Sequence, residues 1–513
     1  MRETTNIALA PDQPSIIRVV LICTAIALGG IIFGYDTGSI SGMVNMTKYI
    51  EAVGDLDKTT NTYSIPTWRS GLIVAGVSMG GLFGSFGFGK VADRYGRKWA
   101  LVGCAAIINV AVVIQAAAYQ SWPAVFIGRC VGGLSIGGLS AICPMYLSET
   151  APSHMRALLV SMFQFLITVG IFLGQTISLG CSYWDNSNGQ FLVPLLSICV
   201  FAVAIICAVS LFVPESARYL ISKDRVAEAR QSLAKVMNIP INAEIIEQEI
   251  IDVQRAVEAD RSTGESTWRE LFSHENRILY RVVLGVAIMM LQQLSGVNYF
   301  FYYGTSLFKA VSNMNPFGTS MILGGVNVVG TICFLPIISK YPRRIVLMMG
   351  SAAMFVAFIL FACIGSFALY DDANNVKSSV GGGMIALACI FIVAFAGTWA
   401  PVSFVVISEM FPQRIRSKAI SLAVASNWLV NTGITFLTPT ATEHIGYKFG
   451  FVFSFFTFIS IFVVYFFVYE TKGHTLENIE VMFMSGISAR QSSSWEPLAD
   501  DSTEIKDESS YNA

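Results

Sequence analysis

The segment SETAPSHMR (Ser148–Arg156) recurs as SEMFPQRIR (Ser408–Arg416), 260 residues further along the chain. Each copy has a proline three residues and an arginine seven residues after its glutamate. A second pair of segments, VPESARYL from Val213 and VYETKGHTL from Val468, repeats at an offset of 255 residues. Because two separate pairs share nearly one offset, the sequence predicts a chain built from two similar halves.

The composition is that of an integral membrane protein. Of the 513 residues, 54% are hydrophobic and 13% are charged, with a mean hydropathy of +0.60, whereas soluble domains carry about 25% charged residues. The net charge of -1 gives no reason to expect a nucleic-acid partner. The ten cysteines lie singly in or beside apolar runs, with no C-x-x-C motif and no histidine at metal-ligand spacing. We therefore expect neither a metal nor a cofactor.

Apolar runs of about 20 residues, the length that crosses a bilayer core of ~30 Å, fall into two sets of six. The first set covers 17–43, 70–91, 98–119, 123–146, 157–180 and 191–213, and the second covers 281–309, 317–340, 344–369, 382–410, 417–438 and 448–469. The predicted fold is all-α, with twelve transmembrane helices in two six-helix bundles that are related by an axis along the membrane normal.

The distribution of basic residues predicts the orientation in the membrane. The loops after the second, fourth, eighth and tenth runs hold most of the basic loop residues, and such loops face the cytoplasm. Both termini are then cytoplasmic. The first run has no cleavage signal and exceeds a signal-peptide core, so we expect a retained span. The sequon NMT at Asn45 falls in the first external loop and is a candidate N-glycosylation site.

Two polar segments flank the second bundle. The first contains RVAEARQSLAKVM and EIIEQEIIDVQRAV, whose apolar spacing predicts amphipathic helices on the inner surface. The last is Ser-rich and acidic, which is typical of disorder. The expected domains are a cytoplasmic N-terminus (1–16), an N-terminal bundle (17–213), a cytoplasmic helical linker (214–280), a C-terminal bundle (281–470) and a cytoplasmic, largely disordered tail (471–513).

Charged residues recur at the inner ends of the spans. In GKVADRYGRK (Gly89–Lys98) the arginines can pair with acids such as Glu149 and Glu215, and Glu409 repeats the setting of Glu149. These residues either form a network of ion pairs that stabilises one conformation, or they are only loop charges of the kind that favour the cytoplasmic side. The residues of the expected network are Asp93, Arg94, Arg97, Glu149, Arg156, Glu215, Arg218, Glu409, Arg416 and Glu470.

Asp36 lies within the first apolar run, where a charge costs about 3 kcal/mol or more. Arg129, in FIGRCVGG of the fourth run, is expected at nearly the same depth, so we predict that the two residues pair. Glycines near both residues should let their two helices approach closely. These are Gly34, Gly38, Gly128 and Gly132. The pair is either a site of proton binding and release or only a structural tie.

Several segments together resemble the major facilitator superfamily and, within it, the sugar porter family. They are GKVADRYGRK, PMYLSETAP, PESARYL, QQLSGVNYFFYYG and YETKG, in the family's order, and the likeness covers about residues 15–485. NYFFYYGTSLF and TWAPVSFVVISEMFP resemble fungal hexose transporters most closely. Ser339 and Pro342 replace an acid and a glycine of the family pattern, so the C-terminal half of the inner network is expected to be weaker. Phe404 and Ala396 depart from the sugar-facing wall of some relatives.

The resemblance implies a sugar site made of amides and aromatic rings. The matching positions are Gln164, Gln292, Gln293, Asn298, Asn327, Asn427 and Trp428, with Trp399 as a further candidate. On an ideal helix Gln293 and Asn298 point ~140° apart, so they share a face only if the helix bends, for which Gly296 is suited. Each amide alone is equally compatible with an interhelical hydrogen bond. Tyr302 and Tyr303 match an outer gate of the family.

The implied function is alternating-access transport of a monosaccharide across the plasma membrane. The expected partners of this monomer are the monosaccharide, a proton and the lipid bilayer. Three hypotheses stay open, of which we favour the first: symport of a hexose or a pentose with a proton through Asp36, passive facilitated diffusion of a hexose, and a non-transporting sugar sensor. The sequence has no nucleophile with its base and no phosphate loop, so we do not expect an enzyme.

Overall fold

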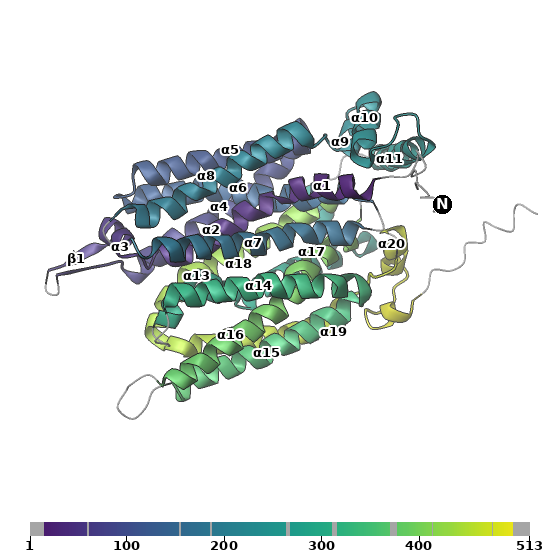
Figure 1. Ribbon diagram of the computed structural model, residues 1–513. Coiled ribbons are helices and arrows are strands. Elements are labelled where there is room, and N and C mark those ends of the chain that lie inside the picture. Colours follow the sequence, from purple (N-terminus) through teal and green to yellow (C-terminus); the bar gives the residue numbers. More distant parts are fainter. Residues whose placement is uncertain are drawn as a thin grey trace, which may run out of the picture.

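The computed structural model describes residues 15–58, 61–152, 155–184, 187–262, 267–309, 315–369, 377–412, 414–474 and 476–495. Most of the expected N-terminus (1–14) and the end of the expected tail (496–513) lie outside these ranges. Long helices run side by side through the molecule, and the described residues contain one small sheet of two strands (Figure 1). The all-α membrane fold that the sequence predicts is confirmed.

The N-terminal half contains six membrane-spanning elements. The first is bent by 41° between α1 (Ile16–Ala27) and α2 (Gly29–Met43). The short helix α3 (Thr47–Val53) and the antiparallel strands β1 (Asp55–Asp57) and β2 (Thr62–Ser64) follow, at an end of the molecule that we call the hairpin end (Figure 1). The other spans are α4 (Thr67–Tyr95), α5 (Arg97–Ala117), α6 (Trp122–Thr150), α7 (Arg156–Cys181) and α8 (Gly189–Phe212).

The C-terminal half repeats this arrangement. Two of its spans are divided, one into α12 (Ile278–Leu294) and α13 (Val297–Lys309), the other into α16 (Ser378–Gly397) and α17 (Trp399–Met410). The others are α14 (Pro316–Lys340), α15 (Arg343–Phe367), α18 (Arg416–Ile445) and α19 (Gly450–Phe467), with the turn η3 (Gly446–Phe449) between the last two. When each divided helix is counted once and Arg416–Phe467 is counted as the two spans α18 and α19, the described residues contain twelve candidate spans, and every predicted apolar run lies on one of them.

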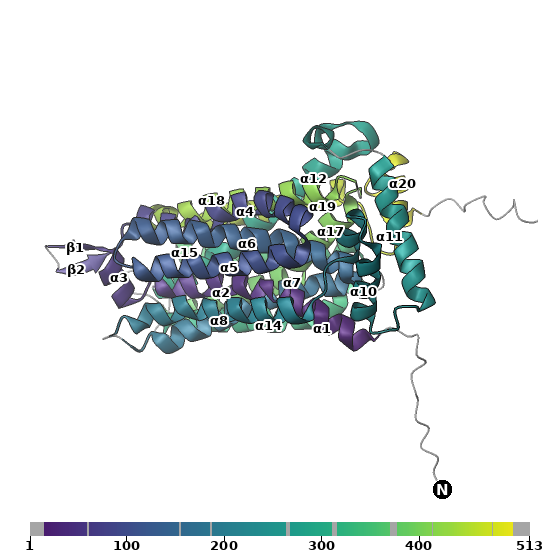
Figure 2. The ribbon, with the colours of Figure 1, turned by 90° about the horizontal axis from the view of Figure 1, so that it is seen from above.

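Short helices cover the other end of the molecule, which we call the linker end (Figure 2). The chain between the halves forms α9 (Ala217–Ser222), α10 (Val226–Met237), α11 (Glu244–Ser262), η1 (Trp268–Phe272) and η2 (Glu275–Arg277). The apolar faces of α9, α10 and α11 form a separate small core that includes Leu220, Ile246 and Ile250. The amphipathic spacing of this segment therefore corresponds to helices that pack mainly on one another.

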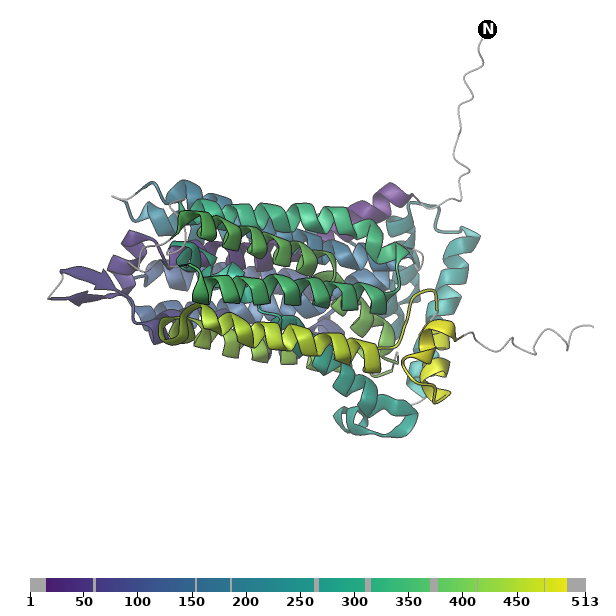
Figure 3. The ribbon, with the colours of Figure 1, turned by 90° about the horizontal axis from the view of Figure 1, so that it is seen from below.

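Part of the tail is ordered, which differs from the expectation that residues 471–513 are largely disordered. Helix α20 (Leu476–Met484) and the turn η4 (Gln491–Ser494) lie against the linker end of the C-terminal bundle (Figure 3). The Phe483 ring lies 4.3 Å from the guanidinium carbon of Arg281, which is buried at the start of α12. The contact with this cation and the burial of the apolar surface around it stabilise the folded part of the tail.

Glycines bring particular pairs of helices into close contact. A Cβ atom on Gly34 would lie 1.9 Å from the carbonyl oxygen of Ile167 on α7, and one on Gly128 would lie 2.5 Å from the Gln115 side chain on α5. These residues therefore draw α2 against α7 and α6 against α5. The sequence interpretation assigned them to an approach of α2 and α6, and the structure differs because each glycine faces another neighbour.

Candidate functional site

The first span of the C-terminal bundle breaks between Gln293 and Asn298. Gly296 has a φ of +88°, a conformation that favours glycine, and a Cβ atom there would lie 2.6 Å from the Phe453 ring. The break turns α13 so that Asn298 Nδ2 donates a hydrogen bond to Gln293 Oε1 at 2.6 Å. The bend that would let these two amides face one another is therefore present.

These amides belong to a chain of hydrogen bonds that joins α12, α13 and α18. Gln293 Nε2 donates to Asn427 Oδ1 at 2.9 Å, and Asn427 Nδ2 donates to Gln292 Oε1 at 2.8 Å. Asn298 Nδ2 also donates to Asn431 Oδ1 at 2.8 Å. The sequence interpretation missed Asn431, although it lies four residues after Asn427 and so on the same helix face. All five side chains are buried.

Trp428 connects this amide chain to the N-terminal bundle. Its indole Nε1 donates to Ser140 Oγ of α6 at 3.2 Å, and its ring centroid lies 5.1 Å from that of Phe33 on α2. A Cβ atom on Gly81 of α4 would lie 2.7 Å from the indole, so this glycine makes room for the ring. The amide chain and Trp428 therefore lie where the two bundles meet.

The other predicted sugar-contact residues have different surroundings. Gln164 on α7 is half-buried and Asn327 on α14 is buried, and neither side chain forms a hydrogen bond within the described ranges. Trp399 Nε1 donates to Ser351 Oγ at 2.8 Å and to Leu347 O at 3.1 Å, both on α15. The polar edge of Trp399 thus points into the C-terminal bundle.

Gln175 on α7 is an amide that the sequence interpretation did not select. It is buried, and neither its Oε1 nor its Nε2 has a hydrogen-bond partner among the residues that the structure describes. A Cβ atom on Gly324 of α14 would lie 2.1 Å from Gln175 Oε1, so the amide sits at a second seam between the bundles. Gln175 follows Gln164 by eleven residues, about three helical turns, and this spacing was the available signal.

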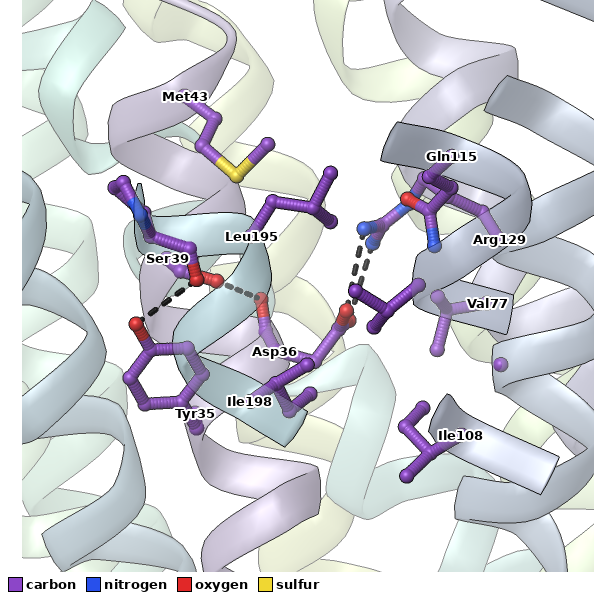
Figure 4. A pocket seen from close by; sticks show the side chains of 13 residues that line it. Tyr35, Asp36, Ser39, Met43, Val77, Ile108, Gln115, Arg129, Leu195 and Ile198 are labelled. Atoms are coloured by element: carbon purple, nitrogen blue, oxygen red, sulfur yellow. Dashed lines mark hydrogen bonds and ion pairs between the residues drawn. The ribbon is translucent and has the colours of Figure 1, made fainter. Parts of the chain in front are cut away.

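Asp36 and Arg129 form a bidentate ion pair inside the N-terminal bundle (Figure 4). Arg129 Nη1 and Nη2 donate to Asp36 Oδ1 and Oδ2 at 3.2 and 3.1 Å. The Arg129 side chain is 3% exposed and the Asp36 side chain 13%. A cavity of about 10 Å³, which is enough for one water molecule, adjoins the pair and is also lined by Tyr35, Ser39 and Gln115.

Tyr302 lies between this ion pair and the amide chain. Tyr302 is buried, and its hydroxyl lies near the side chains of Thr37 and Asn431 and within range of the charge of Asp36. Asn431 in turn accepts the hydrogen bond from Asn298. A short path of contacts therefore leads from the acid in α2 to the amides of the other bundle.

Arg97 is the centre of a charge cluster at the linker end of the N-terminal half. Its Nε and Nη2 donate to the two carboxylate oxygens of Glu149 at 3.1 Å each, and its Nη2 lies 3.1 Å from Asp93. Glu215 accepts the backbone N–H groups of Arg97 at 2.9 Å and of Lys98 at 3.2 Å at the start of α5. Burial raises the pKa of the Glu215 carboxyl above its ordinary value, although these N–H groups favour the charged form.

The C-terminal half carries a related cluster with a longer contact between arginine and glutamate. Arg343 Nη2 lies 3.4 Å from Glu409 Oε1, and Thr471 Oγ1 donates to Glu409 Oε2 at 2.6 Å. Glu470 accepts the backbone N–H groups of Arg343 and Arg344 at 2.9 and 3.0 Å. Arg343 is thus the partner of Glu409, and the expected network did not include it.

The remaining arginines of the expected network also lie at the linker end. Arg416 donates through Nε and Nη2 to the carbonyl oxygen of Phe411 at 3.2 Å, and the Arg94 guanidinium lies 5.5 Å from the ring centroid of its neighbour Tyr95. Arg156 begins α7 and Arg218 lies in α9, both at the linker end.

Asn45, the candidate glycosylation site, takes part in a contact between the two halves. Its Nδ2 donates to Ser306 Oγ of α13 at 2.9 Å and to Ser41 O at 2.9 Å, and Ser306 Oγ donates back to Asn45 Oδ1 at 3.1 Å. On the same helix α13, the hydroxyl of the predicted outer-gate residue Tyr303 donates to Thr435 O of α18 at 2.7 Å. A glycan on Asn45 Nδ2 would remove one of the N–H groups that form these bonds, so this conformation is unfavourable for glycosylation.

Transporters of sugars are similar in sequence to this chain along most of its length. Residues 22–483 match the family model described as sugar (and other) transporter. Hexose transporter HXT10 of Saccharomyces cerevisiae is 40% identical over 501 residues, which cover 96% of this chain and 91% of that protein. The low-affinity glucose transporter of Kluyveromyces lactis is 40% identical over 486 residues, which cover 94% and 85%.

Solved structures agree with the fold. A structure of the proton:xylose symporter XylE bound to 6-bromo-6-deoxy-D-glucose has a TM-score of 0.77 at 25% identity and covers 91% of this chain and 99% of that chain. A partially occluded inward open structure of XylE from E. coli has a TM-score of 0.72 at 24% identity, with coverages of 90% and 100%. Fold and relatives define a multi-pass membrane transporter of sugars and not an enzyme. The chain belongs to the sugar porter family of the major facilitator superfamily.

Proposed function

We propose that this sugar transporter carries a hexose across the plasma membrane together with a proton, by alternating access to one central site between its bundles. The linker end and both termini face the cytoplasm, and the protein works as a monomer. The relatives named as hexose and glucose transporters support the choice of a hexose. The proton:xylose symporter XylE supports coupling to a proton.

The sugar binds at the amide chain of Gln292, Gln293, Asn298, Asn427 and Asn431. Each amide both donates and accepts hydrogen bonds, which suits sugar hydroxyls, and the ring of Trp428 suits the apolar C–H face of a sugar. Without sugar these amides satisfy one another. Incoming hydroxyls replace these hydrogen bonds rather than adding to them, so binding is reversible enough for release on the other side.

The observation that carries proton coupling is the Asp36–Arg129 pair beside a cavity for one water molecule. When Asp36 takes up a proton, its attraction for Arg129 is lost and the contact between α2 and α6 weakens. When the proton leaves, the pair reforms, because an unpaired charge in this buried setting is costly. Tyr302 passes the change to Asn431 and hence to the sugar site.

The same pair supports a second candidate function, passive facilitated diffusion. A buried bidentate ion pair can tie α2 to α6 permanently, since breaking it strands a charge. Under this hypothesis Asp36 stays ionised throughout the cycle, and the sugar only equilibrates across the membrane.

Uptake of labelled glucose, fructose and xylose by cells that lack their own hexose transporters, with the external pH recorded, tests the proposal. We expect alkalinisation on sugar addition and accumulation that a protonophore abolishes. Asp36→Asn should lose accumulation, whereas the control Asp55→Asn, which changes an exposed partner of Arg69 on the hairpin, should retain it.

Two outcomes would overturn symport. If the wild type and Asp36→Asn both only equilibrate sugar, the transporter works by facilitated diffusion. If the protein reaches the plasma membrane but moves none of the three sugars while sugar signalling stays intact, the sensor hypothesis replaces transport.

The sugar site is tested by Gln293→Ala and Asn298→Ala. Because each change leaves a sugar hydroxyl without its hydrogen-bond partner, at a cost of about 1–3 kcal/mol, we expect KM for the sugar to rise about fivefold or more. Asn109→Ala is a matched control, since Asn109 bonds only within its own helix, to Ala105 O at 2.9 Å. An unchanged KM in both site variants would remove this assignment.

A further inference from the structure

The two halves begin their third spans with the same hydrogen-bond pattern. Glu215 and Glu470, which are 255 residues apart, accept the first N–H groups of α5 and α15 respectively. The second residue of each helix is basic and is Lys98 in α5 and Arg344 in α15. Lys98 and Arg344 therefore occupy equivalent places at the linker end.

Both basic side chains also bond to equivalent carbonyl groups. Lys98 Nζ donates to Ser210 O at 2.9 Å, and Arg344 Nη2 donates to Tyr465 O at 2.6 Å. Ser210 and Tyr465 are again 255 residues apart. The internal repeat thus extends to the surroundings of these two cations, and the space beside them can be compared directly.

In the C-terminal half the tail fills this space. Arg344 Nη1 donates to Ala489 O at 2.9 Å and to Ser493 Oγ at 3.3 Å. The guanidinium of Arg490 lies 4.8 Å from the ring centroid of Tyr465. Oxygen acceptors supplied by the chain itself therefore complete the surroundings of Arg344.

In the N-terminal half the corresponding space is a pocket of about 310 Å³. It lies between the start of α5 and the linker helices α9 and α10, which stand beyond the end of α5 (Figure 1). Lys98, Trp99 and Tyr95 line one side, and Arg225, Glu228 and Lys235 line the other.

The charges of this pocket favour an anionic ligand. Lys235 is exposed and forms no hydrogen bond or ion pair with the part of the chain that the structure describes, and its like charge acts on Lys98. The two carboxylates that line the pocket already have partners within the protein. Glu228 lies 2.5 Å from Arg225, and Glu215 accepts the N–H groups at the start of α5. Neither Lys98 nor Lys235 forms an ion pair with the described residues, and the pocket lining has three basic side chains (Lys98, Arg225 and Lys235) against two acidic ones (Glu215 and Glu228).

Aromatic residues mark the position of the pocket relative to the membrane. Trp99 is 58% exposed and Tyr95 is 60% exposed, on the first turn of α5 and the last turn of α4. Exposed Trp and Tyr at the ends of spans gather at the level of the lipid headgroups. The mouth of the pocket is therefore at the depth of phosphate groups.

We propose that this pocket binds the phosphate group of an anionic phospholipid, with Lys98 and Lys235 on the phosphate and Trp99 beside the glycerol and acyl chains. The bound lipid would join α10 of the linker to α5, as the tail joins α15 and α19 in the other half. The choice of leaflet rests on the proposed function, which places the linker end in the cytoplasm. A free phosphate ester offers the same chemistry, and the experiment separates the two sources.

Binding to purified full-length protein in detergent is measured by native mass spectrometry with three probes. Dioleoyl phosphatidic acid carries the phosphate and the acyl chains, dioleoylglycerol only the chains, and glycerol 3-phosphate only the phosphate. We expect the wild type to retain phosphatidic acid in preference to dioleoylglycerol. Each basic residue near a membrane surface contributes roughly a factor of five, so Lys235→Gln should weaken binding about fivefold and Lys235→Glu about thirtyfold.

Lys90→Glu is the matched control, because Lys90 is an exposed lysine near the same end of α4 but does not line the pocket. It should retain phosphatidic acid within twofold of the wild type. Displacement of phosphatidic acid by glycerol 3-phosphate at similar concentrations, with the same dependence on Lys235, would assign the site to a free phosphate ester. Equal binding of dioleoylglycerol, or equal losses in Lys235→Glu and Lys90→Glu, would overturn the proposal. These readouts do not involve transport, so they stand apart from the test of the proposed function.

Discussion

The charge clusters at the linker ends of the two halves differ, although the sequence repeats their motifs. Arg97 bonds to Glu149 through two N–H groups at 3.1 Å and also contacts Asp93, whereas the contact of Arg343 with Glu409 is longer, at 3.4 Å. The residue four places before Arg343 is Ser339, which carries no charge. The repeat thus preserves the helix caps, while Ser339 supplies no acid at the place of Asp93, and we expect the C-terminal cluster to open more easily.

Removal of each arginine should give the largest difference in stability between the two clusters. Arg97→Met leaves Glu149 buried without its cation, at a cost of about 3–5 kcal/mol. Arg343→Met should cost less, about 1–2 kcal/mol, because its contact with Glu409 is longer and the Glu409 side chain is 21% exposed against 9% for Glu149. Thermal denaturation of the purified variants measures the difference. Equal losses of stability would show that the two clusters are equivalent in strength.

The turns before the two arginines should differ by a smaller amount. Gly96 has a φ of +101° and a ψ of 158°, a conformation that is nearly restricted to glycine, and a Cβ atom there would lie 2.1 Å from Glu215 Oε2. Gly96→Ala should therefore cost about 2 kcal/mol. Pro342 has a φ of −58°, which any residue adopts, so Pro342→Ala should cost less than about 1 kcal/mol.

The same denaturation assay applies to both turn variants. A Gly96→Ala protein as stable as the wild type would mean that Glu215 and the turn can rearrange, and the N-terminal cluster would then be less rigid than its contacts indicate.

Addition of an acid to the C-terminal cluster should have the smallest effect. Ser339→Asp places an acid four residues before Arg343, as Asp93 stands four residues before Arg97. It should stabilise the protein by about 0.5 kcal/mol, because the matching Asp93 side chain is 52% exposed and exposed ion pairs contribute little. Ser339→Asn is the control, with a similar shape and no charge. If both variants shift the melting temperature equally, the missing charge does not explain the weaker cluster.

The geometry of the sugar site could be predicted from the sequence where it depends on residues that are close together along the chain. The two amides Gln293 and Asn298 could face each other only across a bend, and Gly296 marked the position of that bend. Asp36 and Arg129 could be paired because depth in a bilayer follows from counting residues along two helices of opposite direction. Neither step required knowledge of which helices are neighbours.

Sequence reasoning failed where the choice depends on helix rotation. Arg343 and Arg416 stand equally near the linker end, but only the turn before α15 brings the backbone of Arg343 to Glu470 and its side chain to Glu409. Gln175 looked like another polar residue in an apolar run until its face was seen to lie against α14.

By itself, the sequence determined twelve spans, two repeated halves and an acid and an arginine at one depth, because hydrophobic length and residue spacing are local properties. Only the tertiary structure decided which amides bond, that the tail folds over Arg281, and that the N-terminal half keeps an open basic pocket where the C-terminal half holds its own chain. These outcomes depend on how helices that are far apart in the sequence rotate and pack. The hydrophobic pattern of a helix says little about its rotation or its neighbours in a membrane bundle.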